Sequence, residues 1–234
     1  MRPATALTWL SIVALLTVPR ASSQDASEVA TVTASARLDP SSPEFVPQAE
    51  EPPLVAWREV SDKPCRWLGR KVRVRLQYAS EPATWNPYLT RFGSGQFDAV
   101  EAWSDEQFPW NEDEFRFPAA RVFVRKGSPA QHELVGAETY ARYEVTLIVR
   151  EVFLDQPWAE IVAVRPMLDR ISEATVIHAA RALELMGQGA WTLAGLEFEA
   201  ALSAPLPDAA TVELVRLRDV CADQAREAST PRNR

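Results

Sequence analysis

The spacing of apolar residues changes once along this chain, near Pro166. Before that point apolar and polar residues alternate in several short stretches, which is the pattern of β-strands with one buried face. After it apolar residues recur at every third or fourth position, as they do on amphipathic helices. Strands and helices that occupy separate stretches favour an α+β fold over alternating β–α units. The sequence therefore predicts a β-domain over 57–166 and a helical unit over 167–228.

The first strand of the β-domain has the strictest alternation, and four further strands are expected after it. The five predicted strands span Gly69–Tyr78, 97–103, 117–126, 141–153 and 158–164, with a turn at 154–157 between the last two. The two faces predicted for the first strand are an apolar one with Val72, Val74 and Leu76 and a basic one with Lys71, Arg73 and Arg75. The alternation predicts that only the apolar face is buried.

Three helices are expected in the helical unit. Ser172 can cap the first, because its hydroxyl can accept a hydrogen bond from a free backbone N–H, and Gly187 would end it. The second is expected to begin at Ala190, and Asp208 can cap the third. Two antiparallel helices and a third beside them would share one apolar core.

The N-terminus has the anatomy of a secretory signal peptide. Arg2 precedes an apolar run from Leu7 to Val18, and small residues at Ala21 and Ser23 follow it. The run is shorter than the roughly 20 apolar residues that cross a bilayer. We therefore expect a signal peptide over 1–23, and a periplasmic or secreted product with no stable membrane anchor after cleavage. Retention of the segment as an uncleaved anchor is the alternative.

Two segments have the composition of unfolded chain. Residues 24–56 are rich in Ala, Ser, Pro, Glu and Thr and have no sustained period, so we expect a disordered tether. We also expect the last residues, 229–234, to be disordered. The folded part of the protein is thus predicted to lie between these two segments.

The chain is acidic, with a net charge of −7. Removing residues 1–23 takes away two arginines and no acid, which lowers the net charge to −9. A negative balance opposes general attraction to nucleic acid and to anionic lipid, because both are bound chiefly by basic side chains. Nucleic acid is therefore an unlikely partner, although a local basic patch could still bind an anion.

The five predicted strands resemble an OB-fold. The resemblance rests on Leu68–Arg70, which opens the long first strand, and on the closing hairpin, where Asp155–Trp158 turns into Trp158–Ile161. It implies a small five-stranded antiparallel β-barrel that binds oligonucleotides, oligosaccharides or protein segments across strands 2 and 3. Here that face departs from a nucleic-acid binder, because 97–115 holds seven acids and no Lys or Arg.

The second part resembles a single tetratricopeptide unit. The residues that carry the resemblance are Gly189, Trp191, Ala194, Phe198 and Ala201, followed by Pro205 and Pro207. The resemblance implies a helical hairpin that docks a protein segment, with Trp191 and Phe198 as candidate partner-binding residues. One repeat cannot bury its own apolar face, so the third helix, the β-domain or a second subunit must cover it, and a homo-oligomer is possible. An ordinary amphipathic hairpin is the alternative.

No spacing of reactive residues indicates catalysis, a metal or a cofactor. His132 and His178 are the two histidines, and they are too far apart in sequence to form a His-x-x-x-His metal motif. Cys65 and Cys221 would join as a disulfide in an oxidising compartment or remain as separate buried thiols, and both possibilities stay open.

Two groups of surface residues are candidate ligand contacts. The basic ladder of Lys71, Arg73 and Arg75 could meet a polyanionic glycan or polymer phosphates, or could instead pair with Glu144 or Glu160 across the sheet. Trp103 and Trp110 lie in an aromatic and acidic stretch that could form a sugar or peptide platform, or could pack over the end of the barrel.

These observations favour an exported, non-enzymatic binding and assembly protein that recognises a protein segment or a cell-envelope polymer. Two alternatives remain. One is a carbohydrate-active hydrolase that uses paired carboxylates within 98–114, the candidates being Asp98, Glu101, Asp105 and Glu106. The other is single-stranded nucleic-acid binding through Arg73 and Arg75.

Overall fold

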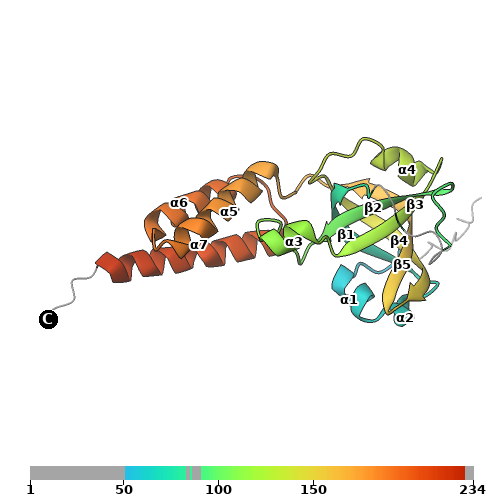
Figure 1. The fold of residues 1–234 in the computed structure, drawn as a ribbon, viewed down its shortest axis with the longest axis horizontal. Coiled ribbons are helices and arrows are strands. Elements are labelled where there is room, and N and C mark those ends of the chain that lie inside the picture. Colours follow the sequence, from blue (N-terminus) through green and yellow to red (C-terminus); the bar gives the residue numbers. More distant parts are fainter. Residues whose placement is uncertain (1–50, 83–84, 86–90, 230–234) are drawn as a thin grey trace, which may run out of the picture. The chain divides into compact units, whose positions relative to one another are not determined.

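The computed structural model describes residues 51–82, 85 and 91–229 (Figure 1). The signal peptide predicted at 1–23, the tether up to residue 50 and the tail from residue 230 lie outside the described residues. The elements in chain order are α1 (Trp57–Asp62), α2 (Pro64–Trp67), β1 (Lys71–Ser80), β2 (Phe97–Ser104), α3 (Glu112–Arg116), β3 (Ala120–Arg125), α4 (Pro129–Leu134), β4 (Arg142–Phe153), β5 (Gln156–Pro166), α5 (Glu173–Gly187), α6 (Trp191–Ala201) and α7 (Asp208–Ser229).

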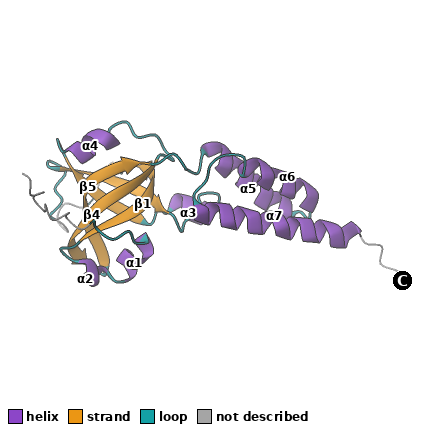
Figure 2. Ribbon diagram, turned by 180° about the vertical axis from the view of Figure 1, so that it is seen from behind, coloured by secondary structure: helices purple, strands orange, loops and turns teal. Residues whose placement is uncertain are grey.

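The five strands close into a barrel, and the C-terminal helices follow it, so the fold is α+β as predicted (Figure 2). The strand order around the barrel is β1-β2-β3-β5-β4, which is compatible with an OB-like barrel. The expectation that the barrel is antiparallel throughout is wrong for one pair, because β3 runs parallel to β5. The chain passes through α4 and β4 between these strands, and this crossover brings β5 back in the direction of β3.

The barrel core is built from the apolar faces of the strands, and short helices close both ends. Val72, Val74 and Leu76 of β1 are buried, which confirms the alternation predicted for the first strand. Trp57 of α1 and Leu134 of α4 belong to the same core. Figure 1 shows α4 at one end of the barrel and α1 with α2 at the other. Helices of four to six residues carry too few turns to show a helical period in the sequence.

The folded part begins before Trp57. Leu54 forms a parallel bridge with Arg73, and the Arg73 backbone N–H donates to the Pro53 carbonyl at 2.8 Å. The segment 53–55 therefore adds a short strand to β1, and the boundary predicted between residues 56 and 57 is too late by a few residues. β2 pairs with β1 only from Leu76 onward. The edge of β1 before Leu76 therefore has free backbone groups, and these pair with residues 53–55.

The β4–β5 hairpin turns on two residues rather than on the four predicted. Phe153 pairs with Gln156, which leaves Leu154 and Asp155 at the turn. Their φ angles are +50° and +56°, the left-handed conformation that a type I′ turn requires at both positions. Leucine is an uncommon residue in this conformation, because its Cβ crowds the backbone there.

The three predicted helices are present. The Ser172 hydroxyl accepts a hydrogen bond from the Thr175 backbone N–H at 3.1 Å, as expected of a helix N-cap. α6 packs against both α5 and α7, with Phe198 fully buried among small residues of all three helices. None of the helices in the described part of the chain has both the length and the apolar character that a membrane span requires.

Both cysteines are free thiols, so the disulfide considered for Cys65 and Cys221 is not formed. Cys65 is exposed on α2 near the barrel, whereas Cys221 is buried in α7 among the residues of the helical core. Burial raises the pKa of the Cys221 thiol. A thiol with a raised pKa is a weak nucleophile, as expected for a side chain that serves packing.

A buried arginine ties the barrel to the segment that precedes α5. Arg142, 2% exposed, forms ion pairs with Asp105 and Asp169. Burial by itself would lower the pKa of the Arg142 guanidinium, but its hydrogen bonds and charge interactions with the two aspartates outweigh this and raise it. Beside it, the buried Gln77 side chain donates to the Ile171 carbonyl and accepts from the Ile171 N–H.

Candidate functional site

The basic ladder lies on the outer face of β1, where Arg73 and Arg75 both pair with Glu144. Arg73 Nη1 is 3.1 Å and Arg75 Nε is 3.6 Å from the Glu144 carboxylate. Lys71 is exposed on the same face. The expectation of cross-strand pairing with Glu144 is therefore met.

Trp103 and Trp110 do not form an open platform. Trp103 is 3% exposed and stacks against Phe115 and Tyr140, and Trp110 is 5% exposed and packs with residues of the helical core. Both rings stabilise the loop between β2 and β3, so they are not available to a ligand in this structure. Of the two residues suggested for partner binding in the helices, Phe198 is fully buried and Trp191 is half-buried.

The carboxylates suggested for a hydrolase are engaged with different basic residues. Asp98 pairs with Lys126, Glu101 with Arg121 and Asp105 with Arg142. Glu101 and Asp98 are three residues apart on β2, so they fall on opposite faces of the strand. Glu106 is exposed in the turn after β2. Asp98 and Glu101 therefore do not face the same substrate bond, as the two carboxylates of a glycoside hydrolase must.

The histidines also have separate surroundings. His132 is exposed on α4. His178 of α5 lies 2.7 Å from the Glu197 carboxylate of α6, which also pairs with Arg181. Within the described part of the chain, no three His, Cys, Asp or Glu residues are grouped as a metal ion would require.

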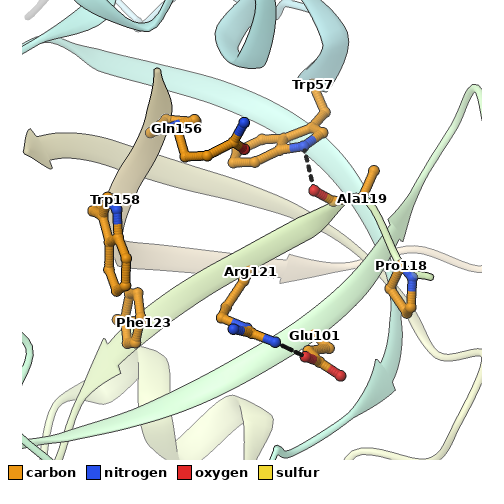
Figure 3. Close-up of a pocket in the computed structure, with 9 residues that line it drawn as sticks. Trp57, Glu101, Pro118, Ala119, Arg121, Phe123, Gln156 and Trp158 are labelled. Atoms are coloured by element: carbon orange, nitrogen blue, oxygen red, sulfur yellow. Dashed lines mark hydrogen bonds and ion pairs between the residues drawn. The ribbon is translucent and has the colours of Figure 1, made fainter. Parts of the chain in front are cut away.

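A recess lies on the outer wall of the barrel, over β2, β3 and the start of β5 (Figure 3). Its volume is about 240 Å³. Three aromatic rings, two prolines and three polar side chains surround it. The lining residues are Trp57, Glu101, Pro118, Ala119, Arg121, Phe123, Gln156, Pro157 and Trp158.

One wall of the recess is the end of an aromatic stack. Phe123, fully buried, lies between the parallel rings of Phe92 and Trp158, at centroid distances of 4.4 and 5.4 Å. Trp85 meets Phe123 edge-on at 5.6 Å. The half-buried Trp158 ring therefore has one face fixed by Phe123, and packing rather than a ligand sets its orientation.

A second wall carries fixed polar groups. Arg121 and Glu101 lie directly opposite each other on β3 and β2 and form an ion pair, which Figure 3 shows across the recess from Trp57. The Trp57 indole N–H donates to the Ala119 carbonyl at 3.1 Å. One carboxylate and one guanidinium leave the recess without net charge, and the exposed Gln156 adds an amide at the rim.

The Trp158 indole nitrogen is an unusual detail of this wall. It is buried and has no hydrogen-bond partner among the residues that the structure describes. Buried indole N–H groups are normally paired, because an unpaired donor costs about 1–3 kcal/mol. A small side-chain movement or a bound polar group would satisfy this donor, and the recess lies beside it.

Sequence reasoning did not identify this recess. Glu101, Arg121 and Trp158 come from three strands, and only the parallel pairing of β3 with β5 brings the last of them close to the other two. The OB-fold resemblance implied binding across strands 2 and 3, and that expectation is the one signal that points to this wall.

Comparisons with protein-family models, with curated proteins and with solved structures find no match to this chain. A function for the chain is therefore inferred from the geometry of its recess and its surface.

Proposed function

We propose that this chain is an exported, non-enzymatic binding and assembly protein whose barrel holds one ring of a carbohydrate polymer in the recess beside Trp158. The single observation that carries the proposal is the combination of a fixed, half-buried tryptophan with an arginine, a glutamate and a glutamine around one uncharged recess. The signal peptide predicted at the N-terminus supports export.

The chemistry of a sugar ring fits these walls. One face of a pyranose carries C–H groups that pack against an indole, and its edge carries hydroxyls that both donate and accept. Carboxylate, guanidinium and amide groups are planar hydrogen-bonding partners for such hydroxyls. A recess of about 240 Å³ is smaller than the roughly 300–1,000 Å³ of sites for drug-sized ligands, which favours recognition of one unit of a longer chain.

The barrel architecture supports the same assignment. OB-like barrels bind oligosaccharides, oligonucleotides or protein segments across strands 2 and 3. The recess has no net charge, so it offers no excess positive charge for the phosphates of a nucleic acid. A hydrolase would need two carboxyl groups about 5–9 Å apart across the scissile bond, and among the described residues that line the recess Glu101 is the one carboxylate.

In this proposal the helical unit provides the assembly function, by docking a protein segment as a tetratricopeptide-like hairpin. Its support is the set Ala194, Phe198 and Ala201, which occupy the buried face of α6 with the spacing of that repeat.

The test is a calorimetric titration of the full chain with a panel of neutral oligosaccharides and proline-rich peptides. We expect a sugar to bind, and we expect Trp158→Ala and Arg121→Gln each to weaken binding about tenfold or more. Trp191→Ala, which changes a half-buried tryptophan on α6 outside the recess, is the matched control and should bind the sugar as the unaltered protein does.

Two results would contradict the assignment. Binding of the peptides but of no sugar would make the ligand a protein segment. Sugar binding that is unchanged in the Trp158→Ala and Arg121→Gln proteins would place the site elsewhere.

A further inference from the structure

A second feature of the barrel wall lies on the outer face of β1, β4 and β5 and reaches β3. Two glutamates, Glu144 and Glu160, are buried on this face at 6% exposure each. Five arginines surround them. Arg73, Arg75 and Arg165 approach Glu144, and Arg125 and Arg150 approach Glu160. We call these five arginines with their two glutamates the arginine strip.

The strip holds more positive charge than its glutamates require. Glu51 also pairs with Arg73, and against these three acids, counted over the described residues, the five arginines keep a surplus of two positive charges. Pairs elsewhere in the described residues, such as Arg58 with Asp62 and Arg216 with Glu213, match one arginine to one acid. A local excess of positive charge in a chain of net charge −7 is therefore concentrated on one face.

The sheet register fixes the positions of these guanidinium groups. Arg75, Glu144 and Arg165 stand directly opposite one another on β1, β4 and β5. Neighbouring strands are about 4.8 Å apart, so the two arginines flank the glutamate at about 10 Å from each other. Each guanidinium has five N–H donors, and a single carboxylate contact leaves others directed to solvent. The Arg165 and Arg125 side chains are 67% and 53% exposed.

We propose that the arginine strip is a binding site for an anionic polysaccharide, whose sulfate, phosphate or carboxylate groups take up the surplus guanidinium donors. Buried glutamates hold the arginines in place before the polymer arrives, which lowers the conformational entropy lost on binding. Arginine is suited to this role, because its planar donors match the oxygens of such anions in pairs.

The surface between the two glutamates favours a polysaccharide over a single-stranded nucleic acid as the ligand. Thr146, Ile148 and Ala163 occupy the outward positions there, so this stretch of the described residues has no aromatic ring on which bases could stack. The Phe97 ring beside Arg125 is 4% exposed and is already covered by the Arg125 guanidinium at 4.6 Å. Proteins that bind single strands rely on such stacking as well as on charge. The site does not depend on the recess beside Trp158.

The experiment measures binding of the full chain to dextran sulfate and to neutral dextran at low and at physiological ionic strength. We expect dextran sulfate to bind with strong salt dependence and neutral dextran not to bind at the strip. The double variant R125Q/R165Q removes two exposed arginines and leaves Arg150 on Glu160 and Arg73 with Arg75 on Glu144, so both glutamates stay paired. It should weaken dextran sulfate binding about tenfold.

The control R58Q/R216Q makes the same change in net charge at two exposed arginines outside the strip. It should bind within about twofold of the unaltered protein, and Trp158→Ala should bind dextran sulfate normally. Three results would overturn the proposal: no binding of dextran sulfate at low ionic strength, equal losses in R125Q/R165Q and R58Q/R216Q, or tighter binding of a single-stranded oligonucleotide than of dextran sulfate.

Discussion

The barrel and the helical unit bury their apolar side chains to different degrees. The barrel fills its interior with branched and aromatic residues and closes both ends with short helices. The helical core is built largely on alanines around Phe198, while Ile177, Leu193, Leu196 and Val212 remain 56–68% exposed. Alanines let helices approach closely but bury little apolar area each. The barrel core is thus built on many branched and aromatic side chains, whereas the helical core combines five alanines with a few large side chains, among them Phe198, Leu214 and Trp110.

The largest expected effect is at Phe198. Phe198→Ala should lower the free energy of unfolding by about 3–5 kcal/mol, because it removes a fully buried ring and leaves a cavity among small residues that cannot fill it. Leu196→Ala on the same helix, at a position 57% exposed, should change it by less than about 0.5 kcal/mol. Urea unfolding of both proteins measures the difference. Equal effects would show that the helical core does not depend on Phe198.

The next effect tests the link between the two parts. Arg142→Gln should lower the free energy of unfolding by about 3 kcal/mol, because it leaves Asp105 and Asp169 without their buried partner. Arg218→Gln removes an arginine that pairs with the exposed Asp219, and it should lower the free energy of unfolding by less than about 1 kcal/mol. Thermal unfolding followed by circular dichroism compares the two. If Arg142→Gln were as mild as the control, the buried ion pairs would not stabilise this junction.

A smaller effect of opposite sign is expected at the barrel hairpin. Replacing Leu154 and Asp155 by Asn and Gly should raise the free energy of unfolding by about 1 kcal/mol, because these residues adopt positive φ more readily. Leu154 is 78% exposed, so little packing is lost. Chemical denaturation of the double variant tests this, and a loss of stability would mean that the turn does not require the left-handed conformation.

The smallest expected effect is a pH dependence in the helices. A hydrogen bond from His178, and secondarily the charge of Arg181, lowers the pKa of Glu197 despite some opposing desolvation. A lowered folded-state pKa adds stability that is present above the unfolded pKa and is lost as pH falls through the folded pKa. Glu197→Gln should therefore be slightly less stable than the unaltered protein near neutral pH and equally stable in strong acid. A difference that grows on acidification would contradict this assignment.

The sequence predicts those elements whose period is long enough to repeat. Val72, Val74 and Leu76 mark β1, and Ser172 marks the start of α5, because alternation and capping are local properties. The helices α1 to α4 have too few residues to show a period. Local sequence also cannot reveal that β3 pairs with β5 in parallel, since that pairing depends on the path of the whole chain.

The candidate sites also depend on contacts between distant parts of the chain, which local sequence does not reveal. Pairing of Arg75 with Glu144 was expected because a sheet register can be guessed from two strands, but Arg165 joins them from a third. Trp103 and Trp110 looked accessible in an acidic stretch, yet their apolar area is better buried against neighbouring rings and helices. Glu101, Arg121 and Trp158 have no shared local pattern and meet only in the closed barrel.

We propose that the outer wall of β2, β3 and early β5 holds the sugar ring. Hydrogen–deuterium exchange of the full chain, with and without the oligosaccharide that binds most tightly, tests it directly. Slower exchange is expected at residues 99–101, at 121–123 and at the amides of Gln156 and Trp158, with little change in α5 to α7. Protection confined to the helices, with no change on these three strand segments, would contradict it.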